Sequence, residues 1–457
     1  MKIFSAEQLY EADKITIEKQ QITSEALMER AGTQIFNWLH QRLNGTPVPI
    51  RIFCGIGNNG GDGLVVGRML IEHGYNVIVY VVNCSDKRSK NFLINYDRIK
   101  NVTKKWPLLM KGESDFPEIN PEDIIVDAIF GIGLNRCPGG WVKKLIQYLN
   151  ESKAFKLAID IPSGLYSNLP LEDTEAVLKA NHTLTFQTPK LSFFLPETAS
   201  FVSNFDVLEI GLDIEFLQTT EPIGQLISKL EAQRFYKPRE KFDHKGTYGH
   251  TLIVSGSYGK MGAAVLSTTS AFRIGAGMVT AFVPKCGYAI IQTTIPEAMV
   301  ITDKEEDYLS NISFDFEPSA IGIGMGIGKN DATVAAFKKI LQNKDIPFVI
   351  DADALNILSE NKAMLKLLPK NSILTPHPGE LKRLIGEWKN DYEKLEKTKK
   401  FSEKYEVVVI IKGAYTITVY GDKLYINTTG NPGMGTAGSG DALSGVITGL
   451  LSQGYDA

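Results

Sequence analysis

Acidic, amide and hydroxyl side chains follow the ends of three apolar segments in the first half of the chain. Asn59 lies in the loop that follows residues 50–53, and Asp127 closes the run Ile-Ile-Val-Asp. Ser163 follows a third apolar run, which ends at Asp160. Because open α/β sheets bind ligands beyond the carboxyl ends of their strands, these side chains are expected to converge. Oxygen ligands alone suit an alkali or alkaline-earth cation better than zinc.

Each of these residues also has a plainer interpretation. Asp62 and Ser163 could cap helices, and Asp127 could hydrogen-bond a turn. The loop CGIGNNGGDG at residues 54–63 matches GxGxxG, but Tyr80 stands where a dinucleotide fold has an acid for the ribose. This departure argues against an ordinary dehydrogenase. Three polar strand ends within one domain favour a functional site.

A second glycine-rich loop, TGNPGMGTAGSGD at residues 429–441, precedes a segment with helical apolar spacing. Gly435, Gly438 and Gly440 allow the backbone to approach an anion closely, and Asp441 falls in the first helical turn. Such a loop with a carboxylate suits phosphoryl transfer, in which the acid accepts a hydroxyl proton. The chain contains no GxxxxGK[ST], so it is not a P-loop enzyme.

Composition excludes several classes of protein. The net charge of −3 and the pI of about 6.2 provide no basic field for nucleic acid. No uninterrupted apolar stretch of about 20 residues occurs, so no membrane span is expected. The four cysteines are scattered without metal-ligand spacing, which favours a reducing cytoplasm.

Short apolar runs alternate with helical segments along the chain, which predicts α/β architecture with parallel sheets covered on both faces. We expect two doubly wound domains, 1–215 and 226–457. The stretch from residue 211 to about residue 246, which contains the dense charges of residues 237–241, is interpreted as the junction. The expected strands of the first domain are residues 50–53, 77–82, 124–129, 156–161, 182–187 and 206–210. Those of the second are residues 250–255, 278–283, 320–324, 347–350, 372–374 and 407–411, followed by a hairpin around Gly421. The sequence stops at Ala457, directly after the last expected helix, so we expect a short or truncated second domain.

NNGGDG, VDAIFG and IDIPSG, in this order after a long N-terminal helix, resemble the NAD(P)H-hydrate epimerase family. The resemblance covers about residues 1–215 and implies a Rossmann-like three-layer sandwich. It implies that K⁺ is held by Asn59, Asp127 and Ser163, and that Asp160 contacts the reacting ring as the catalytic acid or base. The residues that it implies for substrate binding are Asn58, Asn59, Gly60, Gly61, Asp62, Gly131, Ile132, Gly133, Leu134, Asn135, Arg136, Cys137 and Asp160.

The GxGD ending of the second loop resembles the ribokinase-like superfamily. GIGMG at 322–326, DAD at 351–353, TPHPGE at 375–380 and KGAYT at 412–416 are together similar to the NAD(P)H-hydrate dehydratase family. The resemblance implies that Asp441 is the catalytic base and that Ala276, Gly326, His377 and Asp441 touch the hydrated dinucleotide. The residues that it implies for the adenine nucleotide are Lys412, Gly413, Ala414, Tyr415, Thr416, Asn431, Gly435, Gly438, Ser439 and Gly440. Mg²⁺ is expected as the phosphate counter-charge, and either ADP or ATP fits as the donor.

Together the two resemblances imply a bifunctional enzyme that repairs the hydrated cofactors NADHX and NADPHX. It would interconvert their R and S epimers and dehydrate the S form, converting ADP to AMP and phosphate. We also expect a homo-oligomer in the cytoplasm, without nucleic-acid or membrane partners. The alternative is a ribokinase-like vitamin or sugar kinase, with the first domain serving as a non-catalytic binding module.

Overall fold

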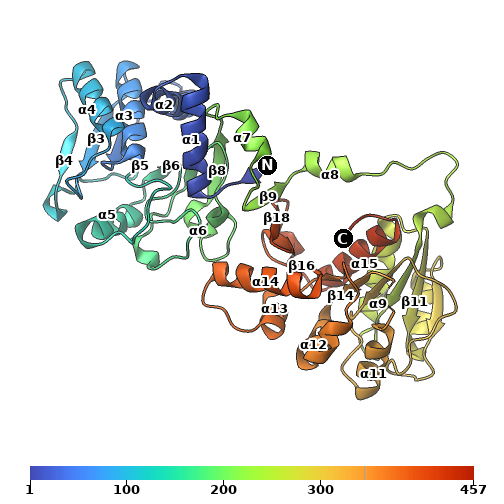
Figure 1. Ribbon diagram of the computed structural model, residues 1–457. Coiled ribbons are helices and arrows are strands. Elements are labelled where there is room, and N and C mark those ends of the chain that lie inside the picture. Colours follow the sequence, from blue (N-terminus) through green and yellow to red (C-terminus); the bar gives the residue numbers. More distant parts are fainter. Residues whose placement is uncertain (344) are drawn as a thin grey trace. The chain divides into compact units, whose positions relative to one another are not determined.

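The chain forms two compact units, residues Met1–Gln225 and Leu226–Ala457. The computed structural model describes residues 1–343 and 345–457. Figure 1 shows helices and a sheet in each unit, and each is therefore an α/β domain of its own.

The first unit is built on a seven-stranded parallel sheet in the order β4-β3-β2-β5-β6-β7-β8. Its strands are β2 (Ile50–Cys54), β3 (Val77–Val82), β4 (Leu108–Met110), β5 (Ile124–Ala128), β6 (Phe155–Ile159), β7 (His182–Phe186) and β8 (Asn204–Leu208). The chain moves outward from β2 to β3 and β4, then returns to β5 on the other side. The strand order therefore reverses between β2 and β5, and ligands bind at such a point in doubly wound folds.

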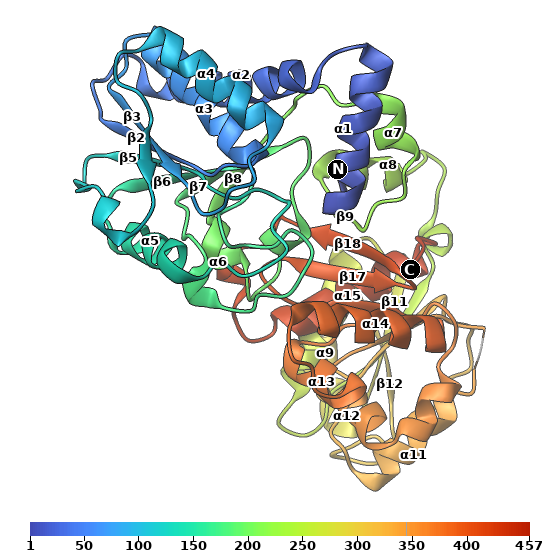
Figure 2. The same cartoon turned by 60° about the vertical axis from the view of Figure 1, so that its left-hand side comes forward.

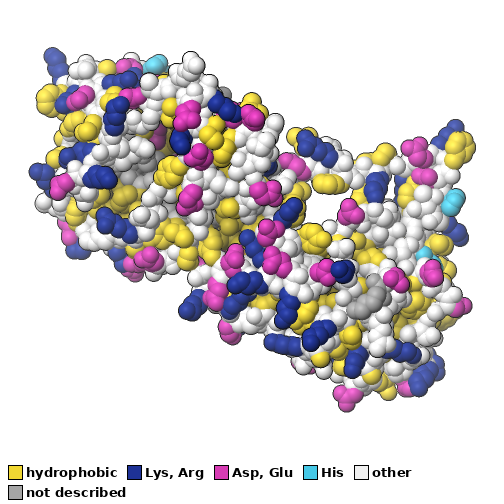
Figure 3. Space-filling view, in the orientation of Figure 1, with side chains coloured by type: hydrophobic (Ala, Val, Ile, Leu, Met, Phe, Trp, Pro, Cys, Tyr) yellow, Lys and Arg dark blue, Asp and Glu magenta, His cyan; other side chains and the backbone are white. Residues whose placement is uncertain are grey.

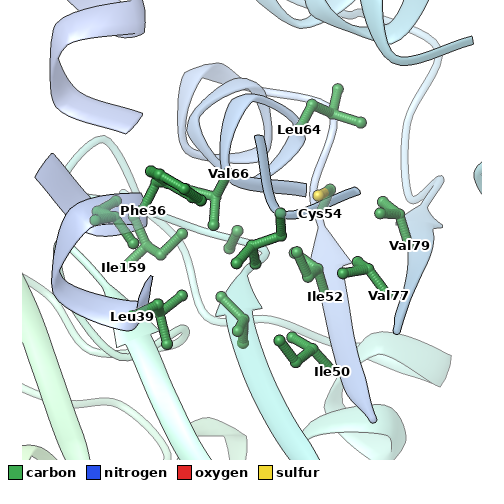
Figure 4. Close-up of a cluster of buried hydrophobic side chains, with 14 of the residues drawn as sticks. Phe36, Leu39, Ile50, Ile52, Cys54, Leu64, Val66, Val77, Val79 and Ile159 are labelled. Carbon is green, nitrogen blue, oxygen red and sulfur yellow. The ribbon is translucent and has the colours of Figure 1, made fainter. Parts of the chain in front are cut away.

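Helices cover both faces of this sheet because alternate side chains of each strand point to opposite faces. Ile50, Ile52 and Cys54 of β2 pack with helices α2 (Ser24–Leu43), α3 (Asn58–Glu72) and α4 (Lys90–Val102) in the cluster of Figure 4. Phe53, between them in sequence, packs instead with α5 (Gly140–Glu151) on the opposite face. Figure 1 shows the same three-layer arrangement.

The two ends of the first unit are joined. Strand β1 (Lys2–Ile3) pairs antiparallel with β9 (Gly224–Ile227), and the Lys2 ammonium donates to the carbonyl of Thr220 at 2.8 Å. Helix α1 (Ala6–Gln20) begins in a capping box at Ser5. It buries Ala12 against Leu27, Ala31, Ile210 and Leu212. The short helices α6 (Ala199–Val202) and α7 (Ile214–Thr219) complete the unit.

The second unit has a mixed sheet in which the order runs β18-β17-β16-β15-β14-β13-β10-β11-β12. Its strands are β10 (His250–Val254), β11 (Met278–Val283), β12 (Met299–Thr302), β13 (Ala320–Ile323), β14 (Phe348–Ile350), β15 (Ile373–Leu374), β16 (Val408–Ile411), β17 (Thr416–Tyr420) and β18 (Lys423–Asn427). From β12 to β16 neighbouring strands pair in parallel, and β16, β17 and β18 pair antiparallel with one another as a meander. The hairpin around Gly421 is present as expected.

Helices α9 (Met261–Arg273) and α15 (Ser439–Ser452) pack tightly against each other and on the sheet. A Cβ on Gly445 would overlap the carbonyl oxygen of Ser267, so the two backbones touch there. Helices α12 (Ala352–Glu360), α13 (Pro378–Ile385) and α14 (Asp391–Tyr405) form a consecutive series in which neighbours contact each other (Figure 2). The remaining helices are α8 (Lys229–Phe235), α10 (Tyr288–Thr294) and α11 (Asp331–Ile340).

The expected α/β class and parallel sheets are confirmed. Strands β4 and β12 were missing from the expectation because both are short edge strands with partly exposed residues. On the face in Figure 3, Lys and Arg side chains are interspersed with Asp and Glu side chains. Among the described residues, no helix is long and apolar enough to cross a membrane.

Candidate active sites

A cavity of about 440 Å³ opens at the carboxyl edge of the first sheet, where the strand order reverses. Its walls come from α1, from the loops after β2, β3, β5, β6 and β7, and from the segment after β8. The polar and charged residues that line it are Tyr10, Asp13, Asn58, Asn59, Asp62, Ser85, Lys87, Asn135, Arg136, Asp160, Gln187 and Lys190. The edge of the sheet thus brings together side chains from the predicted motifs with others that the motifs did not indicate.

Asn59, Asp127 and Ser163 meet beneath this cavity. Asp127 is fully buried, and its carboxylate accepts hydrogen bonds from the Ser163 hydroxyl at 2.6 Å and the Ser163 amide at 2.7 Å. It also accepts from the Ile129 amide at 3.1 Å. The Asn59 amide donates to the carbonyl of Phe130 at 2.9 Å. Burial raises the pKa of Asp127 to about 6, because its effect outweighs that of the three hydrogen bonds, which lower the pKa.

These residues fit a monovalent cation by the chemistry of their donors. The side-chain oxygen of Asn59 is buried without a hydrogen-bond partner, and such an orphaned acceptor costs free energy unless something binds it. The Phe130 carbonyl and the Asp127 carboxylate supply further oxygens nearby. All of these candidate ligands are oxygens, as an alkali ion prefers.

Asp160 lies at the end of β6 with φ = +65°, a left-handed conformation that is uncommon outside glycine. Its carboxylate accepts a hydrogen bond from the ammonium of Lys190 at 2.7 Å, and 1% of the lysine side chain is exposed. Lys190 also donates to the Thr185 hydroxyl at 2.7 Å and to the carbonyl of Thr188 at 3.1 Å. The carboxylate therefore has a fixed, desolvated counter-charge.

Two further carboxyl groups face the same cavity. Burial, followed by the negative charges of Asp160 and Asp13, raises the pKa of Asp62 well above its usual range. Burial and then the charge of Asp160 raise the pKa of Asp13 to about 6, although Lys190 opposes this. The cavity thus combines an ion-paired carboxylate with two carboxyl groups that hold protons more tightly than usual.

The structure separates the residues predicted to bind substrate into two groups. Asn58, Asn59, Asp62, Asp160 and all of residues 131–136 line the cavity. Gly60 and Gly61 do not: a Cβ on Gly60 would overlap the carbonyl oxygen of Gly55, and one on Gly61 would press against Met28. These two glycines allow the first turn of α3 to pack closely against Gly55 and Met28. Cys137, which was also predicted to bind substrate, does not line the cavity.

Sequence reasoning missed Tyr10, Asp13, Lys87, Gln187 and Lys190. Tyr10 and Asp13 carried a detectable signal, since they are three residues apart and polar on a helix whose other face is apolar. Lys190 lies in the loop after β7, and nothing in its local spacing indicated that it would be buried.

The second site lies at the start of α15. Gly438 takes a left-handed conformation with φ = +87° as the residue before the helix, so glycine is strongly favoured there. Asp441 follows in the first turn and is half-buried. Burial raises its pKa, the charges of Asp351 and Asp353 add to this, and Lys412 opposes them.

Lys412 stands beside this helix start. Its ammonium donates to the carboxylate of Asp351 at 2.9 Å, and the Ser444 hydroxyl donates to the other oxygen of Asp351 at 2.7 Å. Glu380 lies 4.0 Å from the same ammonium, and burial raises its pKa. Asp351 therefore ties the KGAYT turn to α15, and neither Asp351 nor Glu380 was predicted as a site residue.

The two segments predicted to hold the nucleotide are adjacent. A Cβ on Gly430 would overlap the carbonyl oxygen of Ala414, so the loop 429–441 touches the turn 412–416. Gly326 is left-handed at φ = +69° and its carbonyl accepts from the Ser257 hydroxyl at 2.7 Å. His377 and Ala276, which were predicted to touch the hydrated dinucleotide, both make contacts within the protein. The His377 ring caps α13, and Ala276 packs in a hydrophobic core cluster.

Two family models match separate parts of the chain, one within each unit. A family model described as "YjeF-related protein N-terminus" matches residues 24–192, and one described as "NAD(P)H-hydrate dehydratase" matches residues 251–457. The chain is similar to the bifunctional NAD(P)H-hydrate repair enzyme of Moorella thermoacetica, with 34% identity over 99% of this chain and 88% of the relative. The enzyme of the same name from Coxiella burnetii is 33% identical over 99% of this chain and 90% of the relative.

The solved ADP/ATP-dependent NAD(P)H-hydrate dehydratase of Bacillus subtilis is 27% identical, covering 50% of this chain and 81% of that one, with a TM-score of 0.43. Both the fold and the sites define a two-domain α/β enzyme. The chain belongs to the family of bifunctional NAD(P)H-hydrate repair enzymes.

Proposed function

We propose that the first unit epimerises hydrated NADH and NADPH and that the second dehydrates the S epimer with an adenine nucleotide. The observation that carries the proposal is the pairing of two carboxylate sites in one chain. One is a cavity at a sheet edge with Asp160, and the other is a glycine-rich helix start with Asp441. The bifunctional NAD(P)H-hydrate repair enzyme of Moorella thermoacetica aligns with both units, over 99% of this chain.

In the second unit, Asp441 accepts the proton of the C6 hydroxyl while the nucleotide transfers its terminal phosphoryl group to that oxygen. Phosphorylation makes the oxygen a good leaving group. The lone pair of the ring nitrogen then expels phosphate, and loss of a ring proton restores the dihydronicotinamide. A raised pKa suits Asp441 for this task, because a stronger base accepts the proton more readily.

Lys412 supplies the positive charge at the donor side. Its ammonium is held by Asp351 beside Gly440, so it can balance the phosphate oxygens as they approach the backbone amides of α15. Among the described residues, no group of three or more His, Cys, Asp or Glu side chains could hold a metal ion. We expect Mg²⁺ to accompany the nucleotide phosphates, since it prefers phosphate oxygens and water as ligands.

In the first unit, the orphaned oxygen of Asn59 supports K⁺ as the resident ion, with the carboxylate of Asp127 and the hydroxyl of Ser163 beside it. The ion would supply positive charge beneath the substrate and fix the loops after β2, β5 and β6. The cytoplasmic location and the homo-oligomeric state remain predictions.

The decisive experiment incubates the protein separately with the purified R and S epimers of hydrated NADH. With ADP and Mg²⁺, both should yield NADH, and chromatography should show AMP and phosphate in equal amounts. Without nucleotide, each epimer should convert to a mixture faster than in buffer alone. A protein that phosphorylates a vitamin or sugar, and leaves both hydrates untouched, would instead be a ribokinase-like kinase.

A further inference from the structure

We infer that Asp13, on the N-terminal helix, is a second proton-handling residue of the epimerase and works across the cavity from Asp160. The inference rests on the proposed epimerase function of the first unit. It concerns a part of the chain that precedes the matched segment, residues 24–192.

Helix α1 is built to present Asp13 to the cavity. Ala12 and Thr16 are fully buried on its packed face, where the Thr16 hydroxyl accepts a hydrogen bond from the Asp213 amide at 2.8 Å. Leu9, Tyr10 and Asp13, which share another face of the helix at i, i+1 and i+4, line the cavity. Packing of Ala12 and Thr16 on the adjacent face of the helix therefore fixes the position of Asp13.

The groups around Asp13 come from three other elements. Asp160 follows β6, its partner Lys190 follows β7, and Asp62 belongs to α3; Tyr10 lies one helical turn earlier on α1 itself. Lys190 pairs directly with Asp160 at 2.7 Å, whereas it acts on Asp13 only through its charge, without a hydrogen bond. The two carboxyl groups thus reach one ligand from separate walls, Asp160 in an ion pair and Asp13 outside it.

Epimerisation at C6 needs such a pair. A proton passes from Asp13 to the C6 hydroxyl, the C–O bond breaks, and water leaves with the bonding electrons. The ring nitrogen forms a double bond to C6, so the ring carries the positive charge. A water molecule then adds to the opposite face of C6 and gives a proton to the Asp160 carboxylate. One water leaves and one enters, so no oxidant or reductant is consumed, and the reverse turnover uses the two acids in exchanged roles.

Asp13 suits this exchange better than Asp62. Its pKa, raised to about 6 by burial and by Asp160, lies near neutrality, so it gains and loses a proton easily. Burial also raises the pKa of Asp62 well above its usual range, and that group holds its proton more tightly than an ordinary carboxyl group.

The test uses the full chain with Asp13→Asn, Asp13→Glu and, as a matched control, Glu11→Gln on the exposed side of the same helix. Initial rates of R-to-S conversion are measured by chromatography without nucleotide, and dehydration of the S epimer is measured with ADP. Reactions in H₂¹⁸O report the incorporation of label at the C6 hydroxyl.

Asp13→Asn should lower kcat for epimerisation by at least about 100-fold, the usual contribution of an acid–base group, with KM unchanged. Label incorporation should fall in parallel, while dehydration and the Glu11→Gln control keep wild-type rates.

Several outcomes would overturn the inference. Wild-type kcat in Asp13→Asn, a rise in KM alone, or epimerisation without ¹⁸O incorporation by the wild type would each do so. If Asp13→Asn unfolds the first unit, the pH profile decides. The kcat of the wild type should fall as pH rises above about 6, where Asp13 loses its proton. Asp13→Glu should shift the pH at which kcat falls. If this pH stays the same, Asp13 does not supply the proton. A wild type without epimerase activity would instead refute the proposed function.

Discussion

Lys190 and Asp160 form an ion pair at 2.7 Å in which neither side chain is more than 9% exposed. Replacing Lys190 with Met should leave a buried carboxylate without its counter-charge. Loss of one partner from a buried pair costs about 3–5 kcal/mol, so the first unit should unfold at lower denaturant concentration. Unfolding followed by tryptophan fluorescence, to which Trp38, Trp106 and Trp141 of the first unit contribute, would measure this. The double variant Lys190→Met/Asp160→Asn should recover part of the lost stability, and no recovery would mean that the pair is not the cause.

Asp160→Asn should lower epimerase kcat with little change in KM, because asparagine keeps the size of the side chain but cannot accept a proton. Asparagine also tolerates the left-handed backbone at this position, so the fold should be preserved. Steady-state kinetics on each epimer gives both constants. If affinity falls while turnover at saturation stays, Asp160 binds the substrate and another group moves the proton.

Asp441→Asn should abolish dehydration of the S epimer while leaving epimerisation at its wild-type rate. In the proposed mechanism this carboxylate accepts the proton of the C6 hydroxyl, whereas the first unit has its own cavity. The return of NADH absorbance with ADP present measures the first reaction, and chromatography of the epimers measures the second. Dehydration at near wild-type rate would show that Asp441 is not the base.

Epimerisation should depend on K⁺ and should weaken in Asp127→Ala, which removes the carboxylate that hydrogen-bonds Ser163. Rates measured in K⁺ and in a large organic cation of equal ionic strength would show the dependence. Crystals grown in high K⁺ should give an anomalous signal beside Asn59. A zinc-like signal, or no ion at this position, would count against the assignment.

Asp13→Asn should change how stability depends on pH. The pKa of Asp13 is raised from its ordinary value of 3.8, which applies to the unfolded chain, to about 6 in the folded chain. The folded chain therefore holds this proton more tightly, and the carboxyl group opposes folding increasingly as pH rises from about 4 through about 6. Two pKa units correspond to about 3 kcal/mol at most. Relative to wild type, the free energy of unfolding of the variant should increase across this pH range in denaturant titrations. If the two proteins show the same dependence of unfolding free energy on pH, the pKa of Asp13 is not raised in the folded chain.

Much of the fold could be predicted from the sequence because buried parallel strands are continuous apolar runs. The apolar run at residues 77–82 predicts a strand, and these residues form β3 with the same bounds. Strand β12 was not expected, because a four-residue edge strand with partly exposed side chains has no distinctive pattern. Short strands at the margin of a sheet depend on their neighbours more than on their own residues.

The site was predictable where a strand end brings a residue to the sheet edge. Asp127 and Asp160 follow from this rule, since their strands end at the same edge and pair side by side. Lys190 and Asp351 do not, because their importance depends on partners 30 and 61 residues away along the chain. A sequence pattern records what is close in the chain, and these contacts are close only in space.

The segments that flank the matched core of the first unit bear on where this unit can be cut without loss of its pocket. The family model covers residues 24–192, yet Leu9, Tyr10, Asp13, Ile210 and Leu212 all line the cavity. A protein cut to the matched core would keep the motif NNGGDG and lose one wall of the pocket. The flanking segments can therefore change the ligand that a shared core accepts, so relatives with the same central motifs and different N-terminal helices need not share a substrate.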